Sequence, residues 1–468
     1  MTDKLTAKQK AQEPVIPRQK IKDRIFAFWQ GNNKDRLLLF GIIAAVYLFI
    51  KALEEFIPSK FLEKLPSDVS LTLVAAIILV MVVHAVYIFF AQYHRRRNPR
   101  AVTGDYEPSI DIFISAHNEE NVIGATLDYL AKLDYPKLKI YAVNDRSIDK
   151  TSELMHAVAA KHPGKLNILD RDMGAYPGKS AALNDALEMS DGEVICVLDA
   201  DARIDNDFLP NIVKYLADPD VAAVQAQKVI SNPEHNLLTK LQFHEYAMDA
   251  YLQMGRDSIR GSVELRGNGQ LVKRQAVEDV GGWNEETITD DLDLSTSLHV
   301  NAWDIRFSPH TKVFEEGVPS LDGFIKQRRR WAEGSMRRYL NYLLQLFKPG
   351  NLTLVQIFDT FTFLSEFSIP LWISFDIVYE FIRMAAGRET YFSFLMLLSL
   401  GIWAVMFVAH FNGLRIYKQY GVIKAFFYSL LGIAYMLSTW VYVIMLSYRK
   451  ILFSRTVGTW TRTQHGAG

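Results

Sequence analysis

Cysteine is almost absent from this chain. The single cysteine, Cys196, excludes an internal disulfide and a cysteine-rich metal site. Because Cys196 lies in the apolar run 194–198, we expect an inert buried thiol. Net charge is absent as well, since 52 basic residues balance 52 acidic ones. We therefore expect no nucleic-acid partner, and any positive charge that matters must be local.

The N-terminal segment lacks a long apolar run. Residues 1–35 are polar and basic, unlike a cleavable secretory signal. Apolar runs follow at residues 37–53 and 71–91, and the second is long enough to cross a bilayer. We expect two transmembrane helices within residues 36–92. The arginine cluster at 95–97 then assigns the next segment to the cytoplasm by the positive-inside rule.

Apolar character returns near the C-terminus, in the runs 352–382, 391–411 and 424–448. We interpret residues 350–448 as interfacial and transmembrane helices, and residues 449–468 as a cytoplasmic tail. Three crossings would put the tail outside, although its basic residues favour the cytoplasm. These basic residues are Arg449, Lys450, Arg455 and Arg462.

Two explanations of this conflict are open. The run 352–382 could be a hairpin broken near Pro370. Alternatively, residues 352–367, which carry Asp359 and Glu366, could lie flat at the membrane surface as an amphipathic helix.

Residues 105–345 form a different region, in which short β-rich runs alternate with helical patterns. The helical patterns include residues 121–133 and 150–161. This alternation predicts an α/β domain with a parallel, Rossmann-like sheet between the apolar segments. The expected strands are 110–115, 138–143, 166–169, 193–198 and 221–225.

Polar residues follow three of these strands, at 115–120, 144–147 and 199–201. A single acid after a strand is usually a helix cap. Three such sites on one sheet favour a ligand site, because ligands bind at the carboxyl ends of parallel strands. We assign Glu119 and Asp145 to substrate binding on this basis.

Asp199 and Asp201 form an Asp-Ala-Asp turn with hard oxygen ligands one residue apart. Mg²⁺, or Mn²⁺, suits such oxygens and commonly shares its coordination with substrate phosphates. We predict that Asp201 and Asp199 hold this metal. A short Asp-x-Asp motif is weak evidence for a metal site on its own. Its position after an apolar strand strengthens this prediction.

The stretch Gly178-Lys179-Ser180 resembles the end of a Walker phosphate loop. Gly174 stands one residue too close to complete that pattern, which argues against an ATPase. Lys179 is therefore either a donor to a nucleotide or a solvated surface lysine.

Thr289-Asp290-Asp291 precedes an apparent helix, so N-capping is one interpretation. The alternative is chemical, since a sugar transfer that displaces a diphosphate needs a base beside the incoming hydroxyl. Asp291 is our candidate for this base, ahead of Asp290.

The stretch Gln327-Arg328-Arg329-Arg330-Trp331 could be a basic juxtamembrane helix attracted to anionic lipid. The functional interpretation gives Arg330 and Arg329 to the diphosphate, because a planar guanidinium offers paired donors. Trp331 would then shape the acceptor channel.

The ordered motifs at 144–147, 199–201, 289–291 and 327–331 resemble the membrane-bound family 2 glycosyltransferases. The resemblance spans about residues 110–335. It implies a GT-A fold, inversion at the anomeric carbon and a UDP-sugar donor. It also implies residue roles: nucleotide contact for Asp145 and Lys179, diphosphate and metal contact for Asp199 and Asp201, the base for Asp291, and the acceptor end for Gln327, Arg330 and Trp331.

Within that family, residues 264–270 and 283–291 are most similar to the branch that makes β-monoglucosyldiacylglycerol in cyanobacteria. This similarity implies UDP-glucose as donor, 1,2-diacylglycerol as acceptor and Mg²⁺ as cofactor. We therefore expect a multi-pass membrane enzyme with a cytoplasmic catalytic domain, in the plasma membrane or the thylakoid membrane.

Two other functions are compatible with parts of the pattern. A processive polysaccharide synthase would use the C-terminal helices as a secretion channel and would yield a polymer. A transporter with a nucleotide-sensing domain is disfavoured by the missing Walker spacing and by the few charges inside the apolar runs.

Overall fold

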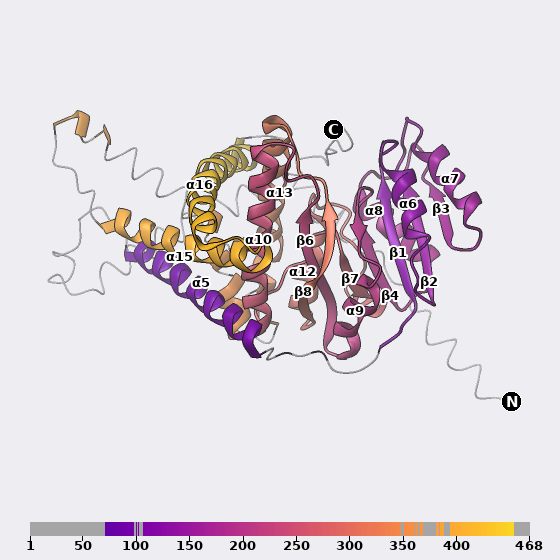
Figure 1. Cartoon of the computed structure of the whole chain (residues 1–468), viewed down its shortest axis with the longest axis horizontal. Helices are drawn as coiled ribbons and strands as arrows, with labels where there is room; N and C mark the ends of the chain where they lie inside the picture. Colours follow the sequence, from indigo (N-terminus) through magenta and orange to yellow (C-terminus); the bar gives the residue numbers. More distant parts are fainter. Residues whose placement is uncertain are drawn as a thin grey trace.

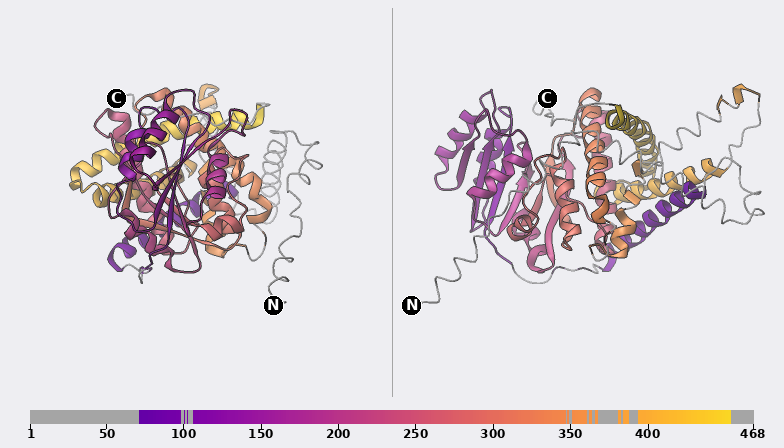
Figure 2. Two further views of the ribbon diagram at one scale, coloured as in Figure 1. Left: turned by 90° about the vertical axis from the view of Figure 1, so that its right-hand side faces the viewer. Right: turned by 180° about the vertical axis from the view of Figure 1, so that it is seen from behind.

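The computed structural model describes residues 71–97, 106–346 and 394–453 without a break, with single residues and short stretches between them (Figure 1). The predicted basic segment 1–35 and the apolar run 37–53 lie outside the described residues. In the described part, the sheet and the helices that cover it form one end of the molecule. Three long apolar helices lie at the other end (Figures 1 and 2).

The sheet has eight strands in the order β3-β2-β1-β4-β7-β6-β8-β5. All five predicted strands are confirmed. β3, β2, β1 and β4 are parallel neighbours, but β7 is antiparallel to both β4 and β6. The predicted parallel arrangement is thus present from β3 to β4, and the sheet as a whole is mixed. The strands are β1 (Ile110–Ala116), β2 (Leu138–Asn144), β3 (Leu166–Asp170), β4 (Val194–Leu198), β5 (Arg203–Ile204), β6 (Val221–Ile230), β7 (Gln270–Lys273) and β8 (Asp304–Glu315).

Successive side chains of the central strands enter two different cores, as the two-residue period of a strand requires. On β1, Ile112 and Ile114 pack in one core and Phe113 packs in the other. Cys196 on β4 is buried in the first core, as predicted. Both faces of the central sheet are thus covered, which explains why its strands are continuous apolar runs.

Helices cover the two faces of the sheet. Those on the first face include α6 and α7, and those on the second include α8, α10 and α12. Their bounds are α6 (Ile123–Leu130), α7 (Thr151–Lys161), α8 (Lys179–Met189), α9 (Phe208–Ile212), the 3₁₀ helix η1 (Val213–Ala217), α10 (Leu237–Ser258), α11 (Arg274–Asp279), α12 (Asp290–Val300) and α13 (Leu321–Leu346).

Three long apolar helices lie beyond α10: α5 (Leu71–Arg97), α15 (Phe394–Tyr417) and α16 (Val422–Phe453). Glycines allow two of them to approach α10 closely. A side chain at Gly255 would meet the Tyr87 carbonyl at 2.4 Å, and one at Gly413 would meet the Ala247 carbonyl at 2.6 Å. Such close backbone contact is typical of packed apolar helices.

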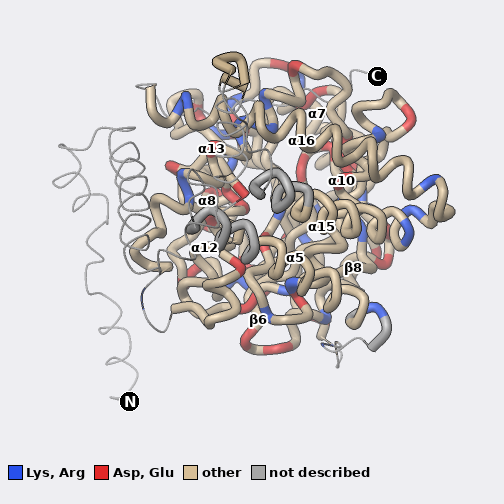
Figure 3. The backbone as a smooth tube through the Cα atoms, turned by 90° about the vertical axis from the view of Figure 1, so that its left-hand side faces the viewer, with Lys and Arg blue, Asp and Glu red and all other residues tan. Residues whose placement is uncertain are grey.

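The apolar helices carry their charge near their ends (Figure 3). Among the described helices, only α16 is both long and apolar enough to cross a bilayer, and α5 contains a shorter apolar stretch, Val80–Tyr93. The helix predicted at residues 71–91 is present as α5, and its crossing of a membrane stays a prediction.

The segment around Asp359 packs onto the protein. The Asp359 side chain is only 2% exposed. It forms an ion pair with Arg256 at 3.2 Å and accepts a hydrogen bond from the Ser262 N–H at 2.7 Å. Asp359 therefore does not face water. Its charge gives no support to the alternative in which residues 352–367 form an amphipathic helix at the membrane surface. The possible break at Pro370 lies outside the described residues.

Candidate active site

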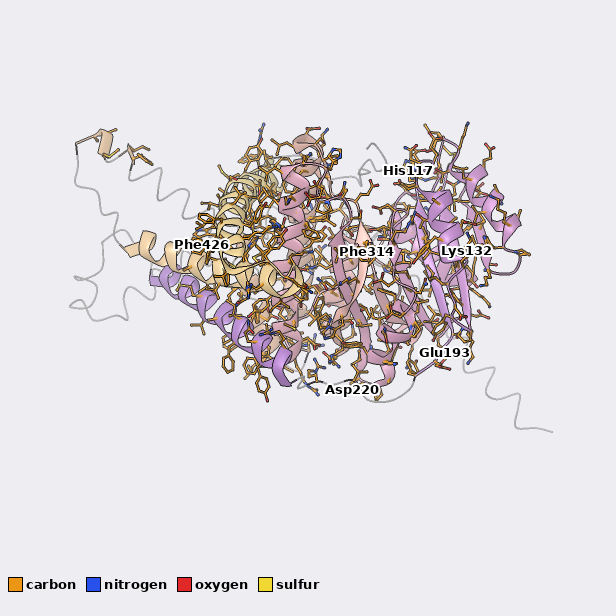
Figure 4. The ribbon with its side chains drawn as sticks, in the orientation of Figure 1. His117, Lys132, Glu193, Asp220, Phe314 and Phe426 are labelled. Carbon is orange, nitrogen blue, oxygen red and sulfur yellow. The ribbon has the colours of Figure 1, made fainter. Side chains whose placement is uncertain are left out.

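The carboxyl ends of the parallel strands meet at one edge of the sheet. His117, just after β1, lies at the upper end of the strands in Figure 4, and Glu193, just before β4, lies at the opposite end. A polar cavity opens at the upper edge. The predicted site residues that line it are Glu119, Lys179, Asp199, Asp201, Asp291, Gln327, Arg330 and Trp331.

Lys179 begins α8 and points into this cavity. Its Nζ lies 2.6 Å from Asp199 Oδ1 and 4.0 Å from Asp290 Oδ2. Burial lowers the pKa of Lys179, but the surrounding carboxylates of Asp199, Asp290 and Asp291 outweigh it and raise the pKa above its usual value. The solvated-lysine alternative is therefore excluded by the geometry, and Lys179 is a fixed positive charge in the site.

Asp145 is not among the residues that line the polar cavity. It is buried, and its oxygens accept bonds from Arg171 at 2.7 Å, from Arg146 at 2.9 Å and from the Gly178 N–H at 3.0 Å. Burial raises the pKa of Asp145, but these donors outweigh it and lower the pKa. Asp145 thus holds the loop before Lys179 in place, and direct nucleotide contact by Asp145 stays a prediction.

Asp201 is oriented by the end of β8, because its Oδ2 accepts a hydrogen bond from the Glu316 N–H at 3.0 Å. Seven carboxylates and four Lys or Arg side chains line the cavity, so negative charge is in excess and a divalent cation fits there. Among the described residues, no three His, Cys, Asp or Glu side chains form a preformed metal site. A cation held by two carboxylates and completed by substrate phosphates is consistent with both findings.

Asp290 and Asp291 open α12 at the cavity wall. Asp290 Oδ2 is buried and accepts no hydrogen bond. Burial raises the pKa of Asp291 to about 6; the Asp290 carboxylate adds to this effect and Lys179 opposes it. A carboxylate with a pKa near neutrality is suited to accept a proton during a reaction.

The start of α12 is held by three neighbours. Ser295 Oγ donates to the Asp291 carbonyl at 2.7 Å and accepts from the Leu265 N–H at 2.8 Å. Arg338 Nη1 donates to the Leu292 carbonyl at 3.0 Å. Gly267 (φ +79°) passes close to the Asp291 side chain, since a Cβ at Gly267 would lie 3.2 Å from Asp291 Oδ2. The position of Asp291 therefore depends on segments far apart in the sequence.

Gly334 of α13 lets that helix touch Thr289, the residue before Asp290. A Cβ at Gly334 would lie 2.4 Å from Thr289 Cγ2 and 3.0 Å from Thr289 Cβ. We expect Gly334→Ala to displace the start of α12 and to reduce activity at least tenfold, which a steady-state assay would measure. Gly124→Ala is the matched control on α6, where the nearest atom is 3.8 Å away. Helix propensity should make that control neutral or slightly stabilising, and equal losses in both variants would contradict the prediction.

The three arginines of the stretch 327–331 point in different directions from helix α13. Arg330 and Trp331 follow Gln327 by three and four residues, and all three line the polar cavity. Arg328 turns away and binds Glu245 through both carboxylate oxygens, at 2.7 and 2.9 Å. Arg329 is not among the cavity-lining residues. The structure thus places Arg330, and not Arg329, at the polar cavity, and diphosphate binding by either arginine stays a prediction.

The sequence analysis did not identify a cluster of four charged residues that line the polar cavity. Lys228 on β6 pairs with Glu315 on β8 at 2.9 Å, and Asn268 donates to the same Glu315 oxygen at 3.1 Å. Lys228, Glu315, Glu316 and Arg266 all line the polar cavity. The one available signal was the pair of acids that ends the β-rich run 304–315.

A second, mostly apolar cavity of about 280 Å³ adjoins the polar one. Asp291 and Trp331 line both cavities, so the candidate base lies where they meet. The apolar cavity is bounded by α13, α15 and α16, and its apolar lining includes Phe324, Phe363, Trp403, Met406, Met436 and Trp440.

Comparison with known proteins places this site in context. Residues 108–334 match the family described as "Glycosyltransferase like family 2". A β-monoglucosyldiacylglycerol synthase from Nostoc sp. is 42% identical over 265 residues, which is 56% of this chain and 56% of the relative. The corresponding Synechocystis sp. enzyme is 42% identical over 250 residues, 52% of each chain. The match thus spans about half the length of these relatives.

Proteins of lower sequence identity also match this chain, in sequence or in structure. A poly-β-1,6-N-acetyl-D-glucosamine synthase from Staphylococcus epidermidis is 28% identical over 277 residues, 58% of this chain and 66% of the relative. Among solved structures, a mannosyltransferase from Pyrobaculum calidifontis, in complex with GDP-Man and Mn²⁺, has a TM-score of 0.52 at 22% identity. It covers 81% of this chain and 99% of its own. This likeness confirms the predicted GT-A fold.

Proposed function

Residues 108–334 of this chain form a glycosyltransferase family 2 domain, and on that premise we propose that the protein transfers glucose from UDP-glucose to 1,2-diacylglycerol. The product is β-monoglucosyldiacylglycerol, formed with inversion at the anomeric carbon. The relatives that are 42% identical carry the name of this activity, which supports the choice of donor and acceptor.

The donor end of the proposed site is the polar cavity. Lys179 and Arg330 are the cations that face the diphosphate, and the loop held by Asp145 lies on the nucleotide side. Arg330 is half-buried, and loss of solvation lowers its pKa although three nearby carboxylates act in the opposite direction. An arginine stays charged and binds a phosphate with two parallel hydrogen bonds.

Asp201 and Asp199 are the residues that would hold Mg²⁺ or Mn²⁺, with the backbone of Glu316 orienting Asp201. When bound, the cation offsets the negative charge that develops on the departing UDP.

The acceptor end is built around Asp291. In the proposed step, the free hydroxyl oxygen of diacylglycerol attacks the anomeric carbon of glucose while the bond from that carbon to the UDP oxygen breaks. The hydroxyl proton passes to Asp291, and UDP leaves with the bonding electron pair. A base with a pKa of about 6 is ionised at neutral pH and can take this proton.

The observation that carries the choice of a lipid acceptor is the apolar cavity beside Asp291. Thirteen of the residues that line this cavity are aromatic or aliphatic, and three of its seven charged residues, Lys228, Arg266 and Asp291, also line the polar cavity. Acyl chains suit such a lining, and Asp291 then meets the glycerol hydroxyl at its polar end.

Purified full-length protein in nanodiscs, supplied with labelled UDP-glucose, dioleoylglycerol and Mg²⁺, tests the proposal directly. We expect one monohexosyl diacylglycerol by mass spectrometry. A ladder or high polymer would favour the polysaccharide-synthase alternative, which the 28% identical relative keeps as a second candidate. Absence of any glycoside would overturn the transferase assignment.

Narrowing the apolar cavity should affect the acceptor but not the donor. Thr439 on α16 lines that cavity, so Thr439→Phe should raise the apparent KM for diacylglycerol about tenfold or more and leave the KM for UDP-glucose unchanged. Ser438→Phe is the matched control, because Ser438 is exposed and lies outside both cavities. Equal effects of the two substitutions on both constants would show that the cavity does not hold the acceptor.

A further inference from the structure

The direction of α16 differs from that of its two apolar neighbours. In Figure 1, α5 and α15 extend away from the sheet side by side, and the view from behind in Figure 2 agrees. α16 instead curves past α10 and α13 and runs across the direction of α5 and α15. It packs against both α13 and α15. If α5 and α15 point into a bilayer, α16 follows its surface.

The two faces of α16 also differ. Ala425, Ser429 and Ser447 are buried on the protein side. Apolar side chains line the outer side along the whole helix, where Phe427 is 65% exposed, Leu437 43% and Met445 46%. Their spacing keeps them on one stripe of the helix. Water would leave this stripe uncovered, but the acyl boundary of a lipid leaflet would bury it.

Positive charge stands at both ends of α16. Lys418 and Lys424 lie at its start, and Arg449 and Lys450 lie at its end. The whole stretch 394–453 contains no Asp or Glu. If α16 crossed the bilayer, one basic end would face the outside, against the positive-inside rule. Both ends on the cytoplasmic surface satisfy the rule and meet anionic headgroups.

We propose that α16 is an interfacial helix that lies in the cytoplasmic leaflet, with its apolar stripe toward the acyl chains and its basic ends among anionic headgroups. This removes one crossing from the C-terminal region and returns the tail to the cytoplasm. The inference concerns the membrane surface and does not depend on which sugar or acceptor the protein uses.

The orientation has a consequence for the apolar cavity. Met436, Trp440 and Val443 of α16 line that cavity, between the helix and the catalytic domain. With α16 in the membrane plane, the cavity lies at the depth of the leaflet surface. A lipid would then reach Asp291 by moving sideways beneath α16, without leaving the membrane for water.

Single-cysteine labelling tests the proposal, and the chain suits it because its one native cysteine is buried. Gly421→Cys before α16 and Phe453→Cys at its end are probed in sealed vesicles of both orientations with an impermeant maleimide. Gly421 has open space around it and Phe453 is exposed. Lys132→Cys on the catalytic domain is the reference. We expect all three to react from the same side. Labelling of positions 421 and 453 from opposite sides would overturn the proposal.

Depth measurements give a second, independent answer. Phe427→Cys, Leu437→Cys and Met445→Cys, each carrying a fluorophore, are quenched by lipids with nitroxides at different depths. A flat helix predicts similar depths for all three. A perpendicular crossing predicts a difference of about 27 Å between positions 427 and 445, and a steady gradient along the helix would contradict the inference. Neither measurement uses sugar transfer, so a failure of the proposed function would be seen separately.

Discussion

Asp291→Asn is expected to lower the transfer rate by about 10³-fold, within the range by which a positioned general base accelerates proton transfer. UDP binding should change little, because Asp291 faces the meeting point of the two cavities and the cations Lys179 and Arg330 remain. A steady-state assay with diacylglycerol and a separate UDP titration measure the two effects. Near-normal turnover in this variant would remove Asp291 from the base role.

The pH dependence of the unmodified enzyme provides an internal check. Because the pKa of Asp291 is raised to about 6, the rate should fall as the pH drops through that value and the carboxylate takes up a proton. In Asp291→Asn, this fall in rate at acidic pH, the acidic limb of the pH–rate profile, should be absent. Asp293 is a matched control nearby, since its pKa is also raised to about 6 by burial, yet it lies outside both cavities. Asp293→Asn should keep the acidic limb.

As the pH falls through the pKa of Asp291, the stability of the protein should rise while its activity falls. The folded-state pKa of Asp291 lies above that of the unfolded chain, so ionisation favours unfolding. The stabilising contribution of the protonated form is present at low pH and is lost as the pH rises through about 6. Asp291→Asn should therefore raise the Tm more at pH 8 than at pH 4. No difference between the two pH values would contradict the loss of solvation that raises the pKa of Asp291.

Arg330→Met is expected to lower the transfer rate by about 10²- to 10³-fold, comparable to the loss of one preorganised donor to a developing anion. Arg330 lies among the carboxylates Asp199, Asp290 and Asp291, and it is the arginine of α13 that lines the polar cavity. Arg330→Lys keeps the charge but loses the paired donors, so its rate should be intermediate.

Arg329→Met is the matched control for Arg330. It removes the same charge from the adjacent position of α13, but Arg329 is not among the residues that line either cavity. If the motif were only a basic surface for anionic lipid, the two substitutions would weaken membrane-dependent activity equally. A selective loss at Arg330, seen at saturating lipid and donor, supports diphosphate binding.

Much of the parallel half of the sheet could be predicted because its strands are buried on both faces. Such strands are continuous apolar runs, and the polar residues at their ends are then conspicuous. Asp199 and Asp201 were found in this way, whereas Lys179 was found through the resemblance of residues 178–180 to a Walker phosphate loop. Asp145 was found by the same rule, but its oxygens turn out to be taken up by Arg171, Arg146 and Gly178.

The part of the sheet beyond β4 was harder to predict. β7 has only four residues, and the chain reaches it through Gly267 and Gly269, which have φ of +79° and +72°. Few residues carry the signal there, and the pairing of β6 with β8 joins segments far apart in the chain. Lys228 and Glu315 meet only because of that pairing, so the pair of acids at the end of β8 was the one local signal for them.

The sequence by itself determined the inventory: which runs are apolar, which acids follow strands, and which basic residues flank the C-terminal helices. The tertiary structure decided what these residues do together. It selected Arg330 over Arg329 for the cavity wall, placed Asp291 between a polar and an apolar cavity, and turned α16 across its neighbours. The physical reason is that composition and periodicity act over a few residues, whereas burial of a charge and the direction of a helix depend on contacts between distant segments.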